Sequence, residues 1–141
     1  MLYLDTSLLV TALAKEASTQ VVQRWLADQE PGSLLISDWT VTEIASAFSI
    51  KLRTGQIDLA QRAGALTAFN SLVAENLIIL PVDTGHFRLA AGFASRHDLS
   101  LRAGDALHLA VAGSHGATLC TLDKRLAEAG PQLGIAVIVP A

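Results

Sequence analysis

The chain has a single cysteine, few aromatic residues, no long apolar run and no excess of basic residues. Because Cys120 has no partner within the chain, an internal disulfide is excluded, and we expect the reducing cytoplasm as its compartment. No apolar stretch reaches the roughly 18 residues of a membrane span, and no basic segment precedes the first apolar stretch, so we expect neither a membrane anchor nor a signal peptide. The net charge of −3 does not by itself indicate a nucleic-acid-binding protein.

Apolar residues are abundant, at 51%, and they fall into short continuous runs separated by longer segments of helical period. Such continuous runs are typical of strands covered on both faces. We expect five strands, at 2–5, 34–37, 77–82, 118–121 and 135–139, and six helices, near 7–15, 18–29, 41–53, 58–75, 84–96 and 103–114.

This alternation predicts one three-layer α/β domain over residues 1–141, with a central, mainly parallel five-stranded sheet between two layers of helices. Pro81 lies within the third apolar run, which predicts an edge position for that strand. The residues "AGPQLG" at 129–134 are typical of a turn before the last strand.

Four acidic residues stand near the strand ends. Asp5 closes the first run, and Glu43 follows the second by about one helical turn. Asp105 opens the helix before the fourth run, and Asp123 comes shortly after that run. Ligands of parallel sheets bind beyond the carboxyl ends of the strands, so we expect these four side chains to converge on one crevice.

Each of these acids also lies near an expected helix start, where a carboxylate can cap free N–H groups. The segment "TVTE" suits a capping box, with Thr40 as the cap and Glu43 reaching back. The capping interpretation suits Asp123 best and Asp5 least. Asp83 also follows a strand, but that strand is expected at the edge of the sheet, so we expect Asp83 to be a helix cap only.

Four carboxylates in one crevice repel one another, and removing their charges from water costs several kcal/mol each. A divalent cation would relieve the repulsion, and an all-oxygen set of ligands favours Mg²⁺ or Mn²⁺ over zinc. We expect Asp5 and Asp105 to bind the cation directly, and Glu43 and Asp123 to act through water or on a second ion. Such a site suits hydrolysis of a phosphodiester bond, because the cation lowers the pKa of a water and neutralises charge on the phosphate.

Several polar residues flank these acids. The hydroxyls of Thr6 and Thr121 could orient a water or a ligand, or only bond the backbone of a turn. Arg102 and His108 lie three residues before and after Asp105, on the same side of the expected helix. Arg102 could contact a phosphate or pair with the acids, whereas His108 is better explained as a hydrogen-bonded residue behind the acids than as a ligand.

The segments "YLDTSLLV", "ISDWTVTEIASAF", "LRAGDALHLA" and "LCTLDKRLAEAG" resemble the four acidic motifs of PIN-domain nucleases, especially the VapC-type toxins of bacterial toxin–antitoxin modules. The resemblance extends over essentially the whole chain. It implies the strand order 3-2-1-4-5, Mg²⁺- or Mn²⁺-dependent cleavage of RNA, a homodimer and a cognate VapB-like antitoxin. The acidic positions of the family correspond to Asp5, Glu43, Asp105 and Asp123, and its hydroxyl positions to Thr6 and Thr121.

The last motif departs from some members of the family, which carry a further acid after its aspartate. Here Lys124, Arg125 and Leu126 follow Asp123, which favours one cation over two. The side chains of Lys124 and Arg125 could border a path for RNA.

Two other functions stay open. The crevice could belong to a phosphatase with Asp5 as nucleophile, although Ser7 stands where such enzymes usually have a second aspartate. It could also belong to a non-catalytic interaction domain that binds a partner's basic segment through charge-assisted hydrogen bonds. Only turnover separates these alternatives from a nuclease.

Overall fold

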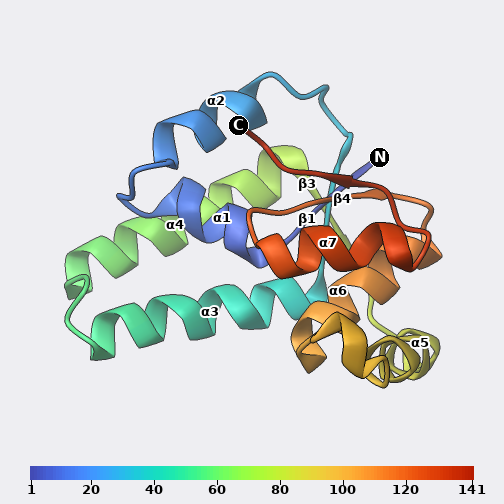
Figure 1. Ribbon diagram of the computed structural model, residues 1–141. Coiled ribbons are helices and arrows are strands. Elements are labelled where there is room, and N and C mark those ends of the chain that lie inside the picture. Colours follow the sequence, from blue (N-terminus) through green and yellow to red (C-terminus); the bar gives the residue numbers. More distant parts are fainter.

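The computed structural model describes all 141 residues and is built around a five-stranded sheet in which every neighbouring pair is parallel (Figure 1). The strands are β1 (Leu2–Leu4), β2 (Leu34–Ser37), β3 (Leu77–Leu80), β4 (Thr118–Cys120) and β5 (Val137–Ile138). Their order across the sheet is β3-β2-β1-β4-β5, as the family resemblance implied. The chain order reverses on either side of the central β1, which is where sheets of this kind bind ligands.

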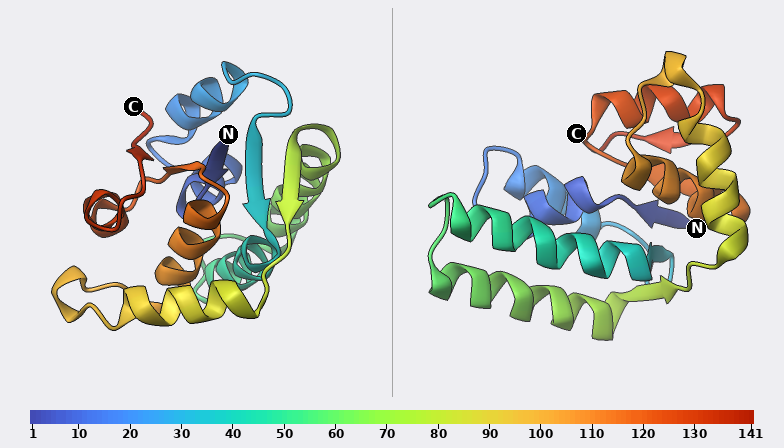
Figure 2. Two further views of the ribbon diagram at one scale, coloured as in Figure 1. Left: turned by 90° about the vertical axis from the view of Figure 1, so that its right-hand side faces the viewer. Right: turned by 90° about the horizontal axis from the view of Figure 1, so that it is seen from below.

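Seven α-helices and one short 3-10 turn, His97–Leu99, connect the strands. The helices are α1 (Thr6–Leu13), α2 (Thr19–Ala27), α3 (Asp38–Arg53), α4 (Leu59–Asn76), α5 (Thr84–Ala94), α6 (Ala103–Ser114) and α7 (Lys124–Gln132). Helices α1–α4 pack together on one side of the strands and α5–α7 on the other (Figure 2). None of the helices combines the length and the apolarity needed to cross a bilayer.

The strand side chains alternate between two cores. Leu4 of β1 and Ile36 of β2 pack with α1, α3 and α4. Tyr3 and Leu35, one residue earlier on each strand, pack on the opposite face with residues of α6 and α7. Both faces of the sheet are therefore covered, which explains why the strands are apolar continuously rather than alternately.

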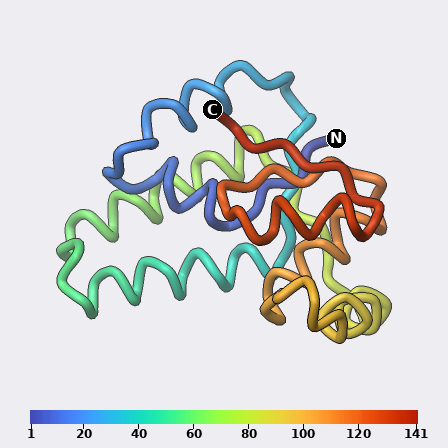
Figure 3. Tube along the Cα trace, in the orientation of Figure 1, coloured from blue at the N-terminus to red at the C-terminus, as the bar shows by residue number.

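The edge strands of the sheet are β3 and β5, and the edge position of β3 was predicted from Pro81. β3 pairs only with β2, so the strand that leads into Pro81 is an edge strand as expected. Asp83 then caps α5, because its Oδ1 accepts a hydrogen bond from the backbone N–H of His86 at 3.2 Å. At the other edge, β5 is only two residues long and lies beside β4, as the red and orange segments of Figure 3 show.

Helix α3 begins three residues before its predicted start, and the predicted capping box is wrong. Ser37 is the cap, and its backbone N–H donates a hydrogen bond to Thr40 Oγ1 at 3.1 Å. Thr40 thus takes the place in the box that the prediction gave to Glu43. Because it has no capping role, Glu43 is free to face the carboxyl end of the sheet.

Helix α7 was missed, because Gly130 and Pro131 are typical of a turn. Gly130 is nevertheless helical and buried, and β5 approaches it closely. A Cβ atom at this position would lie 2.4 Å from Val137 Cγ2 and 3.2 Å from the carbonyl oxygen of Ile135. The glycine is thus required by tertiary packing, which propensity alone does not reveal.

We expect Gly130→Ala to destabilise the protein by about 1–3 kcal/mol, because the added methyl group forces β5 away from α7. The matched control is Gly64→Ala in α4, where nothing lies within 4 Å of the new Cβ. That change should stabilise the protein by about 1 kcal/mol through helix propensity. Denaturant unfolding measures both variants, and a Gly130→Ala protein as stable as the parent would contradict the packing argument.

Candidate active site

Asp5 lies where β1 ends and α1 begins, and it is almost fully buried. It occupies the N-cap position of α1, yet its side chain makes no capping hydrogen bond. Instead Oδ2 accepts hydrogen bonds from Ser7 Oγ at 2.6 Å and from Thr121 Oγ1 at 2.8 Å. Two hydroxyls therefore hold one oxygen of the carboxylate, which leaves Oδ1 available for a ligand.

Thr121 connects the ends of the two central strands. While it donates to Asp5, its Oγ1 also accepts a hydrogen bond from the backbone N–H of Asp123 at 3.0 Å. Ser7 adds a parallel connection by accepting from the backbone N–H of Leu122 at 3.3 Å. The hydroxyl of Thr121 thus orients two of the predicted acids rather than only bonding a local turn.

Glu43 comes from the second turn of α3 and faces the same end of β1. Its Oε1 accepts a hydrogen bond from Thr6 Oγ1 at 2.6 Å and makes a short contact with His108 Nε2. Burial acts to raise the pKa of Glu43, but the hydrogen bond and charge of His108, together with the Thr6 hydroxyl, outweigh burial and lower the pKa. Glu43 is therefore ionised, and its Oε2 packs against the start of α6, where a Cβ at Gly104 would lie 3.0 Å away.

Asp105 stands in the first turn of α6. Burial raises its pKa, and the negative charges of Asp5, Asp123 and Glu43 raise it further, while only the charge of His108 acts in the opposite direction. The contacts place these acids together. His108 Nε2 reaches both Glu43 and Asp5, and Thr121 Oγ1 bonds both Asp5 and the backbone of Asp123. Asp105 lines the same cavity as Asp123, so the four predicted acids lie near one another at the carboxyl end of the sheet.

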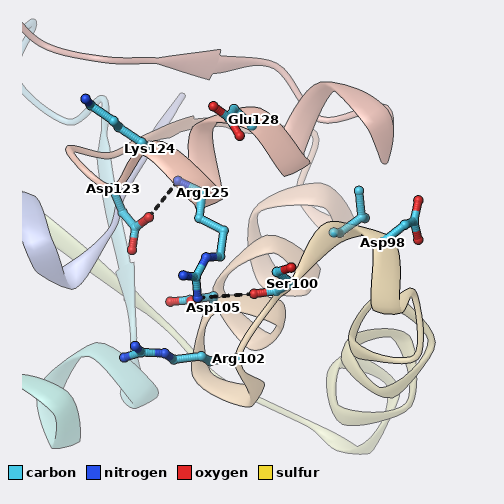
Figure 4. Close-up of a pocket in the computed structure, with 9 residues that line it drawn as sticks. Asp98, Ser100, Arg102, Asp105, Asp123, Lys124, Arg125 and Glu128 are labelled. Atoms are coloured by element: carbon cyan, nitrogen blue, oxygen red, sulfur yellow. Dashed lines mark hydrogen bonds between the residues drawn. The ribbon is translucent and has the colours of Figure 1, made fainter.

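Asp123 has two roles that the sequence analysis treated as alternatives. Its Oδ1 caps α7 by accepting a hydrogen bond from the backbone N–H of Arg125 at 2.9 Å (Figure 4). It also accepts one from the backbone N–H of Leu126 at 3.2 Å. Its negative charge also contributes to the raised pKa of Asp105. Capping therefore orients Asp123 without removing it from the acidic group.

A buried polar group behind the acids was missed by the sequence analysis. The phenol of Tyr3 lies 2.8 Å from Ser37 Oγ and 2.7 Å from His108 Nδ1. His108 Nε2 in turn lies 3.1 Å from Thr6 Oγ1 and 3.7 Å from Asp5 Oδ1. His108 is thus a hydrogen-bonded residue behind the acids, as its spacing from Asp105 suggested, whereas Tyr3 resembled any other apolar strand residue.

A cavity of about 510 Å³ opens beside Asp105 and Asp123 (Figure 4). Eight of its nine lining residues are polar or charged: Asp98, Ser100, Arg102, Asp105, Asp123, Lys124, Arg125 and Glu128. Arg125 is held in place by a hydrogen bond from Nη1 to the carbonyl oxygen of Ser100 at 3.4 Å. Arg102 is exposed and takes part in none of the ion pairs of the chain, so of its two possible roles the pairing with the acids is not observed.

The four acids offer only oxygen atoms as ligands to a cation. No group of three or more His, Cys, Asp or Glu side chains is arranged to hold a metal ion together. The available oxygens come from separate carboxylates. Those of Asp5, Glu43 and Asp123 are partly committed to hydrogen bonds, and they lie around a half-buried Asp105 whose ionisation the other negative charges oppose. This arrangement suits a hard cation that has few direct carboxylate ligands and keeps several waters, as Mg²⁺ does.

Comparison with known proteins identifies the family. The PIN domain family model matches residues 2–130. Ribonuclease VapC35 of Mycobacterium tuberculosis is 30% identical over 145 residues, covering 99% of this chain and 97% of that protein. The crystal structure of FitAcB from Neisseria gonorrhoeae has a TM-score of 0.73 at 21% identity, covering 99% of this chain and 98% of that one. The crystal structure of Mycobacterium tuberculosis VapC20, a sarcin–ricin loop cleaving toxin, has a TM-score of 0.72 at 18% identity, covering 92% and 95%. With this fold and these four acids in place, the chain belongs to the PIN-domain family, among its VapC-type members.

Proposed function

We propose that this protein is a metal-dependent endoribonuclease and the toxin of a toxin–antitoxin module, acting in the cytoplasm. The observation that carries the proposal is the meeting of Asp5, Glu43, Asp105 and Asp123, from four separate parts of the chain, at the carboxyl end of the central strand. Membership of the VapC-type group supports the substrate class, because the similar protein VapC35 is named a ribonuclease and VapC20 a toxin that cleaves the sarcin–ricin loop.

Asp5 and Asp105 are the residues that we expect to hold Mg²⁺ or Mn²⁺ directly, and Glu43 and Asp123 would act through water or on a second ion. When bound, such a cation lowers the pKa of a water and neutralises negative charge on the phosphate. Ser7 and Thr121 keep one oxygen of Asp5 occupied, so the other oxygen is already oriented before the cation arrives. Thr6 does the same for Glu43.

The cavity beside Asp105 offers a path for the RNA. Arg102, Lys124 and Arg125 line it, and their positive charges suit phosphates on either side of the bond to be cut. Positive charge placed next to the acids reconciles an RNA substrate with the net charge of −3. The acidic crevice suits a VapB-like antitoxin that inserts a basic segment, and we expect the toxin to be a homodimer.

Replacing Asp5 by asparagine should abolish RNA cleavage in the presence of Mg²⁺ or Mn²⁺. The amide keeps the shape of the side chain but removes the charge that holds the cation. Loss of the cation raises the activation barrier by several kcal/mol, which lowers the rate about 100-fold or more. A gel assay of the purified protein on total RNA measures this, and a chelator should have the same effect on the parent.

The matched control is Asp83→Asn, which changes an acid at another strand end that only caps α5. This variant should cut RNA at the parent's rate. Cleavage that persists in a chelator, or in Asp5→Asn, would contradict the proposed metal-dependent site. No cleavage by the parent protein would instead leave the non-catalytic interaction domain as the better explanation.

Asp105→Asn should raise the melting temperature of the metal-free protein. Because the folded-state pKa of Asp105 is raised, its ionisation above that pKa costs folding free energy, and the neutral amide removes this cost. Mg²⁺ should stabilise the parent but not Asp105→Asn, whereas Asp83→Asn should keep the parent's response. Thermal unfolding with a chelator and with Mg²⁺ measures both effects, and equal stabilisation of parent and Asp105→Asn would exclude Asp105 as a ligand.

Arg102→Ala should raise KM for RNA with little change in kcat. Each phosphate contact that is lost should also reduce the slope of log affinity against log salt by about 0.7 for single-stranded RNA. Arg24→Ala is the control, since Arg24 is equally exposed but lies on α2, outside the cavity. Steady-state kinetics at several salt concentrations measures the difference, and identical salt slopes for the two variants would remove Arg102 from the RNA path.

A further inference from the structure

A line of buried hydrogen bonds runs behind the acids and joins four elements of the fold. It begins at Ser37 at the end of β2, passes through Tyr3 of β1 and His108 of α6, and ends at Glu43 of α3. Ser37, Tyr3 and His108 are each at most 1% exposed, so water does not satisfy these groups. We call Ser37, Tyr3 and His108 the buried relay.

Each nitrogen of the His108 ring faces a different partner. Nδ1 lies 2.7 Å from the Tyr3 hydroxyl, and Nε2 faces the carboxylate of Glu43. An ionised carboxylate only accepts hydrogen bonds, so Nε2 must carry the proton that it donates to Glu43. Nδ1 bonds the Tyr3 hydroxyl, and the Tyr3 hydroxyl in turn bonds Ser37 Oγ.

This assignment satisfies every polar atom of the buried relay with a single orientation of each group. The Tyr3 phenol lies within hydrogen-bond distance of both Ser37 Oγ and His108 Nδ1. Turning the ring by half a revolution would put carbon atoms against both Tyr3 and Glu43. A buried polar group left without a partner costs about 1–3 kcal/mol, so the ring is held firmly in one orientation.

The fixed orientation of the His108 ring also affects Glu43 and Asp5. His108 Nε2 bonds Glu43 Oε1 and also lies 3.7 Å from Asp5 Oδ1, the oxygen that the hydroxyls of Ser7 and Thr121 leave uncommitted. The position of the ring therefore sets the distance between two of the acids. A phenylalanine at position 3 would fill the same space in the core, so packing does not explain the hydroxyl.

We propose that Tyr3 and Ser37 are positioning residues, which fix the His108 ring and through it the placement of the Glu43 carboxylate relative to Asp5. Neither residue touches the cavity or the substrate path. The effect on cleavage rests on the proposed function, whereas the effect on the His108 ring does not.

The kinetic test uses Tyr3→Phe and Ser37→Ala. Removing an outer hydrogen-bond partner of this kind typically costs 10–100-fold in activity, so we expect kcat for RNA to fall by about 10-fold or more for Tyr3→Phe. KM should change little, because no contact to the RNA is lost. Ser37→Thr keeps a hydroxyl at the same position and should recover most of the activity lost in Ser37→Ala.

Thr11→Val is the matched control for loss of a buried hydroxyl. Thr11 is 8% exposed, and its Oγ1 donates to Glu16 Oε2 at 3.1 Å, away from the buried relay. This variant should keep the parent's kcat even where its melting temperature falls. A fall in kcat that follows melting temperature in all the variants would show general destabilisation and overturn the proposal.

The second measurement needs no activity: ¹⁵N NMR of the His108 ring in the metal-free protein. The parent should give one set of ring signals, with a proton on Nε2 and with Nδ1 hydrogen-bonded to the Tyr3 hydroxyl. Tyr3→Phe should shift the Nδ1 signal and add a second set or broaden the first, whereas Thr11→Val should not. Unchanged ring signals in a folded Tyr3→Phe or Ser37→Ala protein would overturn the proposal.

The two measurements separate this inference from the proposed function. If the parent cuts no RNA, the nuclease proposal fails, and the ring signals still decide whether the buried relay orients His108. If the parent cuts RNA and Asp5→Asn does not, but Tyr3→Phe and Ser37→Ala cut at the parent's rate, the positioning role alone is wrong.

Discussion

Repulsion among carboxylates at the end of β1 is the constraint on which the rest of this site depends. The fold gathers four acids there, and the raised pKa of Asp105 records the cost of ionising one acid beside the others. Such a cost persists in a small domain only if the rest of the fold outweighs it, as functional sites often require. The two cores that cover both faces of the sheet supply that stability.

The hydrogen bonds around the acids divide three of the four carboxylates into a fixed half and an available half. Ser7 and Thr121 hold Oδ2 of Asp5, Thr6 and His108 hold Oε1 of Glu43, and the start of α7 holds Oδ1 of Asp123. The remaining oxygens need little rearrangement to receive a cation or a hydrogen-bond donor. A capping carboxylate and a functional carboxylate are therefore compatible, because a cap uses only one of the two oxygens.

Sequence reasoning worked best where a local pattern and the tertiary structure require the same residue. β2 and α6 have the predicted bounds, because a continuous apolar run and a helical period each permit a single interpretation there. It failed where two local signals competed. The start of α3 was misplaced because both Ser37 and Thr40 are good caps, and α7 was missed because a close contact with Val137, invisible in the local sequence, keeps Gly130 in the helix.

The sequence by itself determined the α/β alternation, the edge position of β3 and the four acids as a candidate site, because each of these follows from neighbours along the chain. Only the tertiary structure decided which oxygen of each acid is free, that Arg102 makes no ion pair, and that Tyr3 and Ser37 stand behind His108. Tyr3 and His108 are separated by 105 positions, so their hydrogen bond exists only after β1 and α6 have packed together. A tyrosine in an apolar strand looks like core packing until the folded chain shows what its hydroxyl meets.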